Sequence, residues 1–279
     1  MPPSPAPPQR FTDTCQQLPS LPEVVRSLLG SLGRDDVSLA EVVGLVAKDS
    51  ALTARLLRLA NSVRYRPLQR VTRLQDAAAI IGLGPLRSLA LGACLAQAFP
   101  RVAGFDRLRF WRLNLATAGY ARWLAGRLNH DADRAEVAGL LLRSGELLML
   151  MTDPGTSALV QAQAGTPDSV FALQQQYFGC SHAELSAELA VRWRFPTALV
   201  DVLFTASDPM AWQPVSAEGA VLRVASVLAD AAELRLDPLV ALQQHQPRLV
   251  RHLGLDLVAL APQLPEFSDL TAPVTELLN

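Results

Sequence analysis

The sequence predicts an all-helical protein, and three observations support this prediction. Apolar residues recur three or four positions apart along most of the chain. Helix-start signals precede several of these stretches, and Ser38 followed by Glu41 forms a capping box. No stretch shows the alternation of apolar and polar residues that predicts a strand. Because 50% of the 279 residues are apolar, the chain has enough apolar surface to bury a substantial core.

The first half of the chain predicts an arm followed by a small helical lobe. Five prolines stand among the first eight residues and disfavour both helix and sheet, so residues 1–17 are expected to be a disordered arm. Order is expected from Leu18. Ser50 is the expected cap of one helix, and Thr72 with Gln75 forms a second capping box. Apolar stripes predict helices over residues 24–32, 39–46, 50–60, 72–81 and 85–99.

The second half predicts a larger helical lobe. Pro100 and Gly104 mark the expected boundary, so the lobes are assigned to residues 18–100 and 101–255. Prolines at positions 262, 265 and 273 predict an irregular tail over residues 256–279. Two long helices, each buried on most faces, are expected over Phe105–Leu128 and Asp133–Met151, and shorter ones over Pro167–Phe178, His182–Arg194, Pro196–Ala206, Ser216–Leu234 and Leu239–Leu255.

Composition excludes several classes of protein. With 25 basic and 26 acidic residues the net charge is −1, which argues against a general nucleic-acid binder. Cys15, Cys94 and Cys180 are widely spaced, so neither a disulfide framework nor a thiolate zinc site is expected, and the cytoplasm is the natural compartment. The N-terminus lacks the apolar core of a secretory signal, and no run reaches the ~20 apolar residues of a membrane span.

Several motifs together resemble the HDOD (HD-related output domain) family. They are Leu-Pro-Ser-Leu-Pro at 18–22, the segment Asp49–Ser62, Val-Thr-Arg-Leu-Gln-Asp-Ala at 71–77 and Ile-Gly-Leu-Gly-Pro-Leu at 81–86. Further matches at 110–112, 138–141, 182–184 and 193–196 extend the likeness to about Ala232. The resemblance implies a two-lobed helical bundle with an HD-like second lobe, in a bacterial signalling protein that acts beside receiver domains or cyclic-dinucleotide enzymes.

The same resemblance shows that the HD metal ligands have been replaced. HD phosphohydrolases bind divalent metals with histidine and aspartate side chains from neighbouring helices. Here Leu113 stands where the first histidine belongs, and Leu142 and Arg143 replace the His-Asp pair. Leucine cannot ligate a cation, and the permanent charge of arginine repels one. We therefore expect no metal site, no cofactor and no catalysis.

Other candidate groups are assigned structural roles. His130-Asp131 lies between two helices and is expected to form a loop or cap, with Asp133 and Glu136 available as capping groups. His182 is expected to enter a helix and to hydrogen-bond a neighbouring segment rather than act as a base. The side chains expected in the core are those of Trp111, Trp123, Trp193 and Phe110. Ala206 and Ser207 replace histidines that some relatives carry before the Asp208-Pro209 turn.

Three functions are weighed. The first is a non-catalytic protein-interaction module of signal transduction, in which Arg55 and Arg58 contact acidic partners. The second is a sensor that binds a nucleotide second messenger, such as a cyclic dinucleotide, in a residual cleft near Asn61, Arg112 and Arg143. The third, a remote alternative, is a metal-dependent phosphohydrolase with unconventional ligands. Asn61 is otherwise a helix C-cap, and Arg143 either pairs with Glu146 or stays solvated.

Overall fold

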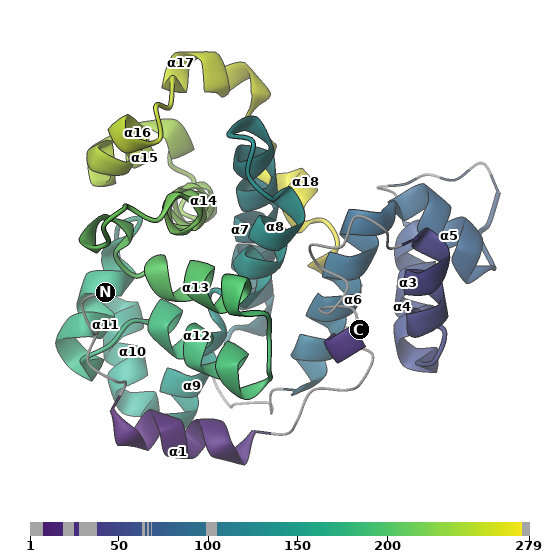
Figure 1. Ribbon diagram of the computed structural model, residues 1–279, viewed down its shortest axis with the longest axis horizontal. Coiled ribbons are helices and arrows are strands. Elements are labelled where there is room, and N and C mark those ends of the chain that lie inside the picture. Colours follow the sequence, from purple (N-terminus) through teal and green to yellow (C-terminus); the bar gives the residue numbers. More distant parts are fainter. Residues whose placement is uncertain are drawn as a thin grey trace.

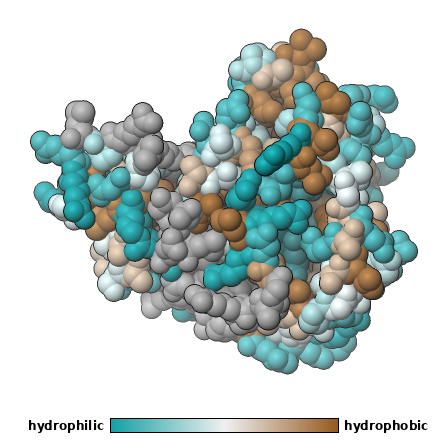
Figure 2. Space-filling view, turned by 180° about the vertical axis from the view of Figure 1, so that it is seen from behind, coloured by the Kyte–Doolittle hydropathy of each residue, from teal (hydrophilic) through white to brown (hydrophobic). Residues whose placement is uncertain are grey.

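A computed structural model describes residues 8–18, 25–27, 38–62, 65, 67, 69–98 and 105–274. Within these residues the secondary structure is helical and no strand occurs, which confirms the predicted fold class. Figure 1 shows two groups of helices, with α3 to α6 on one side and α7 to α17 on the other. A notch separates the smaller group from the larger one in Figure 2. No helix in the described ranges combines the length and the apolarity needed to cross a membrane.

The smaller lobe starts with the predicted capping box. The Glu41 N–H donates to Ser38 Oγ at 3.2 Å, and the Ser38 N–H donates to Glu41 Oε2 at 2.9 Å. The other two predicted caps are wrong. The N-cap of the next helix is Asp49 rather than Ser50, because the Asp49 carboxylate accepts two backbone N–H groups at the positive end of the helix. The N-cap of the helix after it is Arg73 rather than Thr72, and no side chain caps that helix. The helices are α3 (Leu39–Val46), α4 (Ser50–Ala60), α5 (Leu74–Ile81) and α6 (Leu83–Ala98).

The stripe expected over residues 24–32 and the boundary expected at Pro100 to Gly104 lie largely or wholly outside the described residues. Only residues 25–27 of the stripe are described, and they are helical.

The larger lobe is built around α7 (Arg107–Arg127), which packs against α8 (Ala132–Leu141) and α14 (Ala217–Glu233). The prediction of a single helix over Asp133–Met151 is wrong, because the helix is interrupted at Leu142 and Arg143, between α8 and α9. The helix expected over Leu239–Leu255 is also divided, at Gln246. The remaining helices are α9 (Ser144–Thr152), α10 (Pro154–Gln163), α11 (Ser169–Phe178), α12 (His182–Arg192), α13 (Thr197–Thr205), η1 (Pro209–Ala211), α15 (Pro238–His245) and α16 (Pro247–His252).

The expected N-terminal arm is ordered from Pro8 onward, so the prediction of disorder is wrong for residues 9–17. These residues form α1 (Gln9–Gln17), which packs on α9 and α12 of the larger lobe. Phe11 is 1% exposed, and its ring meets the edge of Phe178 at 5.7 Å. The prolines do not prevent this helix, because the last of them, Pro8, precedes its first turn. Residues 1–7 lie outside the described part.

The C-terminal tail is also more regular than expected. It contains α17 (Leu257–Leu260), η2 (Ala261–Gln263) and α18 (Phe267–Thr271). Pro262 lies in the first turn of η2, a position that tolerates proline because its N–H would have no partner in the helix. Helix α18 packs on α7 and α14 and lies between the two groups of helices in Figure 1. The prediction of an irregular tail is therefore wrong for residues 257–263 and 267–271.

Candidate functional site

A buried ion-pair cluster lies where the HD resemblance places the metal ligands. Arg143, at the start of α9, is 3% exposed, and its neighbours come from α9 and α14. Leu113 of α7 lines the same small cavity, of about 30 Å³, and Leu142 is fully buried beside it in the chain. We call Arg143, Glu146, Ser226 and Asp230 the Arg143 cluster.

Both terminal nitrogens of the Arg143 guanidinium are hydrogen-bonded, whereas its buried Nε has no hydrogen-bond partner. Nη1 donates to Glu146 Oε1 at 2.9 Å, while Nη2 donates to Asp230 Oδ1 at 2.5 Å and to Ser226 Oγ at 3.1 Å. Of the two alternatives for Arg143, the ion pair with Glu146 is therefore confirmed. Burial raises the pKa of Glu146 and that of Asp230, and the positive charge of Arg143 opposes this shift in both. Arg143 is thus an internal structural cation, and its assignment as an accessible partner or ligand contact is wrong.

The interruption between α8 and α9 positions the guanidinium of Arg143 within its cluster. Ser186 on α12 bridges the break, since its Oγ accepts the Gly145 N–H at 2.8 Å and donates to the Leu142 carbonyl at 2.6 Å. A Cβ on Gly145 would lie 2.1 Å from the carbonyl oxygen of His182. Only glycine allows α12 to approach this closely, so the contact with α12 accounts for a break that local periodicity did not reveal.

His182 has the structural role expected of it. Its backbone N–H donates to Gln174 Oε1 at 2.8 Å, and Nδ1 lies 2.7 Å from the same oxygen. An amide oxygen only accepts, so Nδ1 carries the proton in the neutral ring. Phe171 packs on the ring, with centroids 4.3 Å apart. Burial, followed by the charges of Arg143 and Arg223, holds the pKa of His182 well below 6.5.

This environment predicts a loss of stability in acid. Below pH 6.5 the unfolded chain binds a proton at His182 and the folded chain does not. The free energy of unfolding is therefore highest above pH 6.5, and well below that pH it decreases by about 1.4 kcal/mol per pH unit. Urea unfolding of the wild type and of His182→Gln at pH 6.5 and 5.5 checks this, and the wild type should lose more stability by about 1 kcal/mol, because half of the unfolded chains already carry the proton at pH 6.5. Equal losses in the two proteins would contradict a neutral buried imidazole.

A second buried arginine, Arg223 on α14, was missed by the sequence analysis. Its Nε pairs with Asp168 Oδ1 at 2.5 Å, and Nη1 donates to the carbonyl oxygens of Ala206 and Ser207 at 3.1 and 2.8 Å. The guanidinium lies 3.3 Å from the centroid of the Phe171 ring. Ala206 and Ser207, where the family resemblance places the histidines of some relatives, therefore serve here as backbone acceptors for an arginine.

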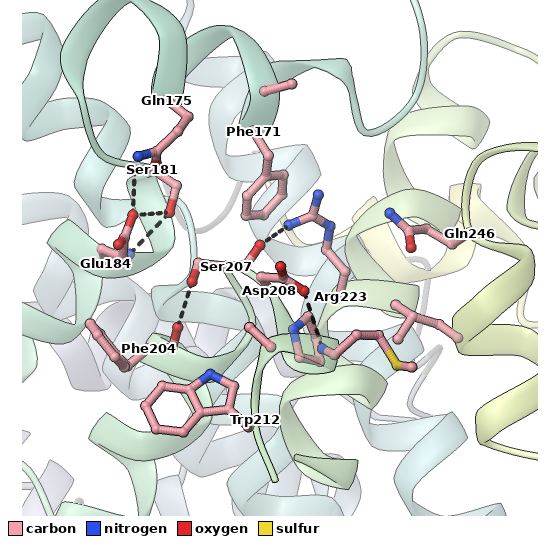
Figure 3. A pocket seen from close by; sticks show the side chains of 15 residues that line it. Phe171, Gln175, Ser181, Glu184, Phe204, Ser207, Asp208, Trp212, Arg223 and Gln246 are labelled. Carbon is pink, nitrogen blue, oxygen red and sulfur yellow. Dashed lines mark hydrogen bonds between the residues drawn. The ribbon is translucent and has the colours of Figure 1, made fainter. Parts of the chain in front are cut away.

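Arg223 forms part of an open cavity of about 580 Å³, which Figure 3 shows from close by. Phe204 and Trp212 meet edge to face on one side, with ring centroids 5.7 Å apart. Asp208 lies near the centre of the view and caps η1 through the Met210 N–H at 3.2 Å. The volume lies in the range of small-molecule sites, and its lining shares no residue with the Arg143 cluster.

The three residues proposed for a nucleotide cleft do not line one cavity. Asn61 caps α4 and closes the following loop, with Nδ2 donating to the Val71 carbonyl at 2.8 Å and Oδ1 accepting the Val71 N–H at 2.8 Å. Arg112 pairs with Glu233 at 3.0 Å and stacks on Phe267 at 5.3 Å. Arg143 is buried in its cluster. The C-cap assignment of Asn61 is therefore confirmed, and a shared cleft for the three residues is not present in the described structure.

Two arginines of α4, the signature helix formed by the Asp49–Ser62 motif, remain accessible. Arg58 is exposed on α4, and Arg55 is partly exposed while its Nη1 donates to the Ala93 carbonyl at 3.4 Å. They lie on one side of α4, three positions apart. The structure therefore leaves this pair available for contact with another molecule.

The remaining candidates behave as core or cap residues. Asp131 caps α8 by accepting the Arg134 N–H at 2.9 Å, so the capping role of the His-Asp dipeptide is confirmed. Asp133 and Glu136, named as possible caps, instead pair with Arg122 at 2.6 and 2.7 Å.

Trp111 and Trp193 are 3% and 4% exposed and Phe110 is 5% exposed, which confirms their place in the core. Trp123 is only partly buried and packs at the edge of that core. In the part of the chain that the structure describes, no group of three histidine, cysteine or acidic side chains is arranged to hold a metal ion.

Comparison with known proteins identifies the family. The HDOD domain matches residues 18–209, which include the signature helix α4 and the Arg143 cluster apart from its α14 members. The chain belongs to the HDOD domain family. The match ends at η1, so α14 to α18 lie beyond the family's common region.

Two solved structures share the fold of this chain over nearly the full length of both proteins. A protein of Shewanella amazonensis SB2B, whose name provisionally assigns it to the phosphohydrolases, is 27% identical, with a TM-score of 0.76 over 97% of this chain and 98% of that one. An HDOD domain protein of unknown function from Geobacter sulfurreducens is 25% identical, with a TM-score of 0.72 over 96% and 98%.

A curated relative, an uncharacterised protein of Treponema pallidum (strain Nichols), is 26% identical over 198 residues. These residues are 69% of this chain but only 38% of the relative, so the chain spans well under half of that protein's length.

Proposed function

We propose that this HDOD protein is a non-catalytic module of bacterial signal transduction that acts in the cytoplasm by binding partner proteins. Receiver-domain proteins and enzymes of cyclic-dinucleotide signalling are the partners that the family resemblance favours. Exposed arginines on a rigid helical scaffold suit such a role, because a planar guanidinium makes two-pronged contacts with carboxylates. Arg55 and Arg58 on α4 are the pair we assign to this contact.

One observation carries the non-catalytic part of the proposal. Where an HD phosphohydrolase holds a metal between histidine and carboxylate ligands, this chain buries the guanidinium of Arg143 against Glu146 and Asp230. The two carboxylates are thereby paired with a permanent cation. A divalent ion placed there would meet that charge in a site with little solvent to screen it, which supports a site closed to metal catalysis.

The catalytic half is tested by metal content and turnover together. The purified protein is dialysed, analysed for manganese, iron and zinc, and assayed for hydrolysis of bis(p-nitrophenyl) phosphate with added Mn²⁺. We expect metal content far below one ion per chain and no turnover above buffer. About one tightly held ion per chain together with turnover would overturn the non-catalytic proposal in favour of a phosphohydrolase.

The partner half is tested with two matched pairs of arginine variants. Arg55→Ala/Arg58→Ala on α4 should weaken the binding of a purified receiver-domain or cyclic-dinucleotide partner by about tenfold, the effect of losing ~1.4 kcal/mol at an interface. Arg248→Ala/Arg251→Ala removes two exposed arginines from α16 and should leave binding unchanged. Titration calorimetry at two salt concentrations measures both, and added salt should weaken wild-type binding. Equal effects of the two pairs would refute the assigned surface.

A nucleotide sensor is the alternative, and the cavity of about 580 Å³ beside Arg223 is large enough for such a ligand. Its charges do not favour a phosphate group, because Arg223 is already paired with Asp168, and the carboxylates of Glu184 and Asp208 belong to the lining. Equilibrium dialysis against cyclic dinucleotides decides between the two functions. Stoichiometric binding that Arg223→Ala abolishes would favour the sensor.

A further inference from the structure

The C-terminal tail contacts both lobes, although its role is not given by the family match. Residues 263–274, here called the strap, lie beyond the HDOD region. On the larger lobe, Gln263 hydrogen-bonds Arg127, and Phe267 lies under the guanidinium of Arg112 at 5.3 Å. Leu270 packs onto Gly119 of α7, where a Cβ would lie 2.4 Å from Leu270 Cδ2. Gly119 therefore provides the space that admits the strap.

The end of the strap enters the smaller lobe. Pro273 sits against a groove between α4 and α6, and Val274 beside it is 7% exposed. Only about 10 Å³ of space remains between Pro273 and these helices, and Pro273 also borders a cavity of about 450 Å³ at the junction of the lobes. We call the site the α4/α6 groove, and it is lined by Leu52, Arg55, Leu56 and Leu59 of α4 and by Leu89 and Ala93 of α6.

The contact has the properties of a replaceable one. Pro273, which lies in the groove, has no N–H to donate, and the neighbouring Val274 is a buried apolar residue, so apolar burial supplies the attachment. The lobes are also joined without the strap, because α6 packs on α8. At the same junction, buried Glu136 accepts hydrogen bonds from Arg122 at 2.7 Å and from Ser88. Release of the strap would therefore uncover an apolar groove without separating the lobes.

The charges around the groove indicate what else would fit. Arg55 lines it, and Arg58 is exposed one helical turn further along α4. Residues 263–279 combine apolar residues with the carboxylates of Glu266, Asp269 and Glu276 and contain no basic residue. A segment of this composition complements an apolar groove that is flanked by arginines.

We propose that the α4/α6 groove is a docking surface for an apolar, carboxylate-bearing segment of a partner protein, and that the strap occupies it in the resting molecule. The partner must then displace the strap, which acts as a competitor within the same chain. The proposal that a partner protein docks in the groove rests on the function proposed above, whereas the proposal that the strap occupies the groove does not.

The test uses a fluorescein-labelled peptide with the sequence of residues 263–279 and two full-length proteins. In Pro273→Asp/Val274→Asp, a carboxylate replaces each apolar side chain, so the strap should leave the groove. Anisotropy titration should then show binding to this variant at least about tenfold tighter than to the wild type, whose groove is free for only a small fraction of the time. Leu236→Asp/Val240→Asp adds the same charge at sites that are 49% and 53% exposed and should behave as the wild type.

Circular dichroism establishes that the variants are folded. If the aspartate pair unfolds the protein, Pro273→Ala/Val274→Ala replaces it, with an expected gain in peptide affinity of about threefold. Equal peptide affinity for wild type and released variant, or no binding to the released variant, would overturn the occupancy of the groove by the strap.

The charge requirement is tested in the same assay. A peptide with Glu266→Gln, Asp269→Asn and Glu276→Gln should bind the released variant at least about threefold more weakly, and Arg55→Ala/Arg58→Ala in that variant should remove this difference. Unchanged affinity would overturn the carboxylate preference. Because this assay contains no signalling partner, its failure leaves the proposed function standing, and failure of the calorimetric partner test leaves the strap result standing.

Discussion

Replacing Arg143 with methionine should destabilise the fold by about 3–5 kcal/mol, the cost of leaving buried charges without their partner. The guanidinium is 3% exposed, and it is the ion-pair partner of both Glu146 and Asp230. Methionine fills a similar volume but leaves two carboxylates that must either stay charged in a poorly solvated site or take up protons. Chemical denaturation at pH 7.5 measures the loss.

The matched control removes the charges together. In Arg143→Met/Glu146→Gln/Asp230→Asn no ionised group remains in the cluster, so most of the stability should return, to within about 1–2 kcal/mol of the wild type. If the triple variant were as unstable as Arg143→Met alone, packing around the side chain would be responsible and the electrostatic account of the cluster would fail.

Replacing Gly145 with alanine should cost about 3 kcal/mol or prevent folding, because the added Cβ would lie 2.1 Å from the carbonyl oxygen of His182. The obstructing atom belongs to the backbone of α12, which a rotamer change cannot move. If α12 moved away to make room for the Cβ, the hydrogen bond from the Gly145 N–H to Ser186 Oγ would be broken. Thermal and urea unfolding of the purified variant measure the effect.

Gly126→Ala is the control, since Gly126 lies in α7 and a Cβ there would meet nothing within 4 Å. Alanine has the higher helix propensity, so this variant should gain up to about 0.5–1 kcal/mol. Opposite signs at the two glycines are the expected result. A neutral Gly145→Ala would show that α9 and α12 are able to move apart, and would argue against the break as a rigid support for Arg143.

The sequence by itself determined the helical class, and the HDOD resemblance led to the expectation that the HD metal ligands are substituted. Helical periodicity and the Ser38–Glu41 capping box depend on residues within one or two turns, so they can be recognised without the fold. The identities of Leu113, Leu142 and Arg143 were likewise sufficient to predict that the HD metal ligands are missing. The core positions of Trp111 and Trp193 also followed from the apolar stripes around them, and the structural role of His182 followed from the absence of a nucleophile or metal site near it in the sequence.

Only the tertiary structure decided which groups Arg143 pairs with. Arg143 meets Ser226 and Asp230 more than eighty positions along the chain, and Ser186 closes the α8–α9 break from α12. Distant helices bury Phe11 of α1 and partly cover Leu270 of the strap, and this apolar burial stabilises both segments. The positions of the prolines in the sequence do not reveal that stabilisation. Local propensities are short-ranged, whereas burial and charge pairing join residues that are distant in sequence, and these long-range contacts fixed the details of the site.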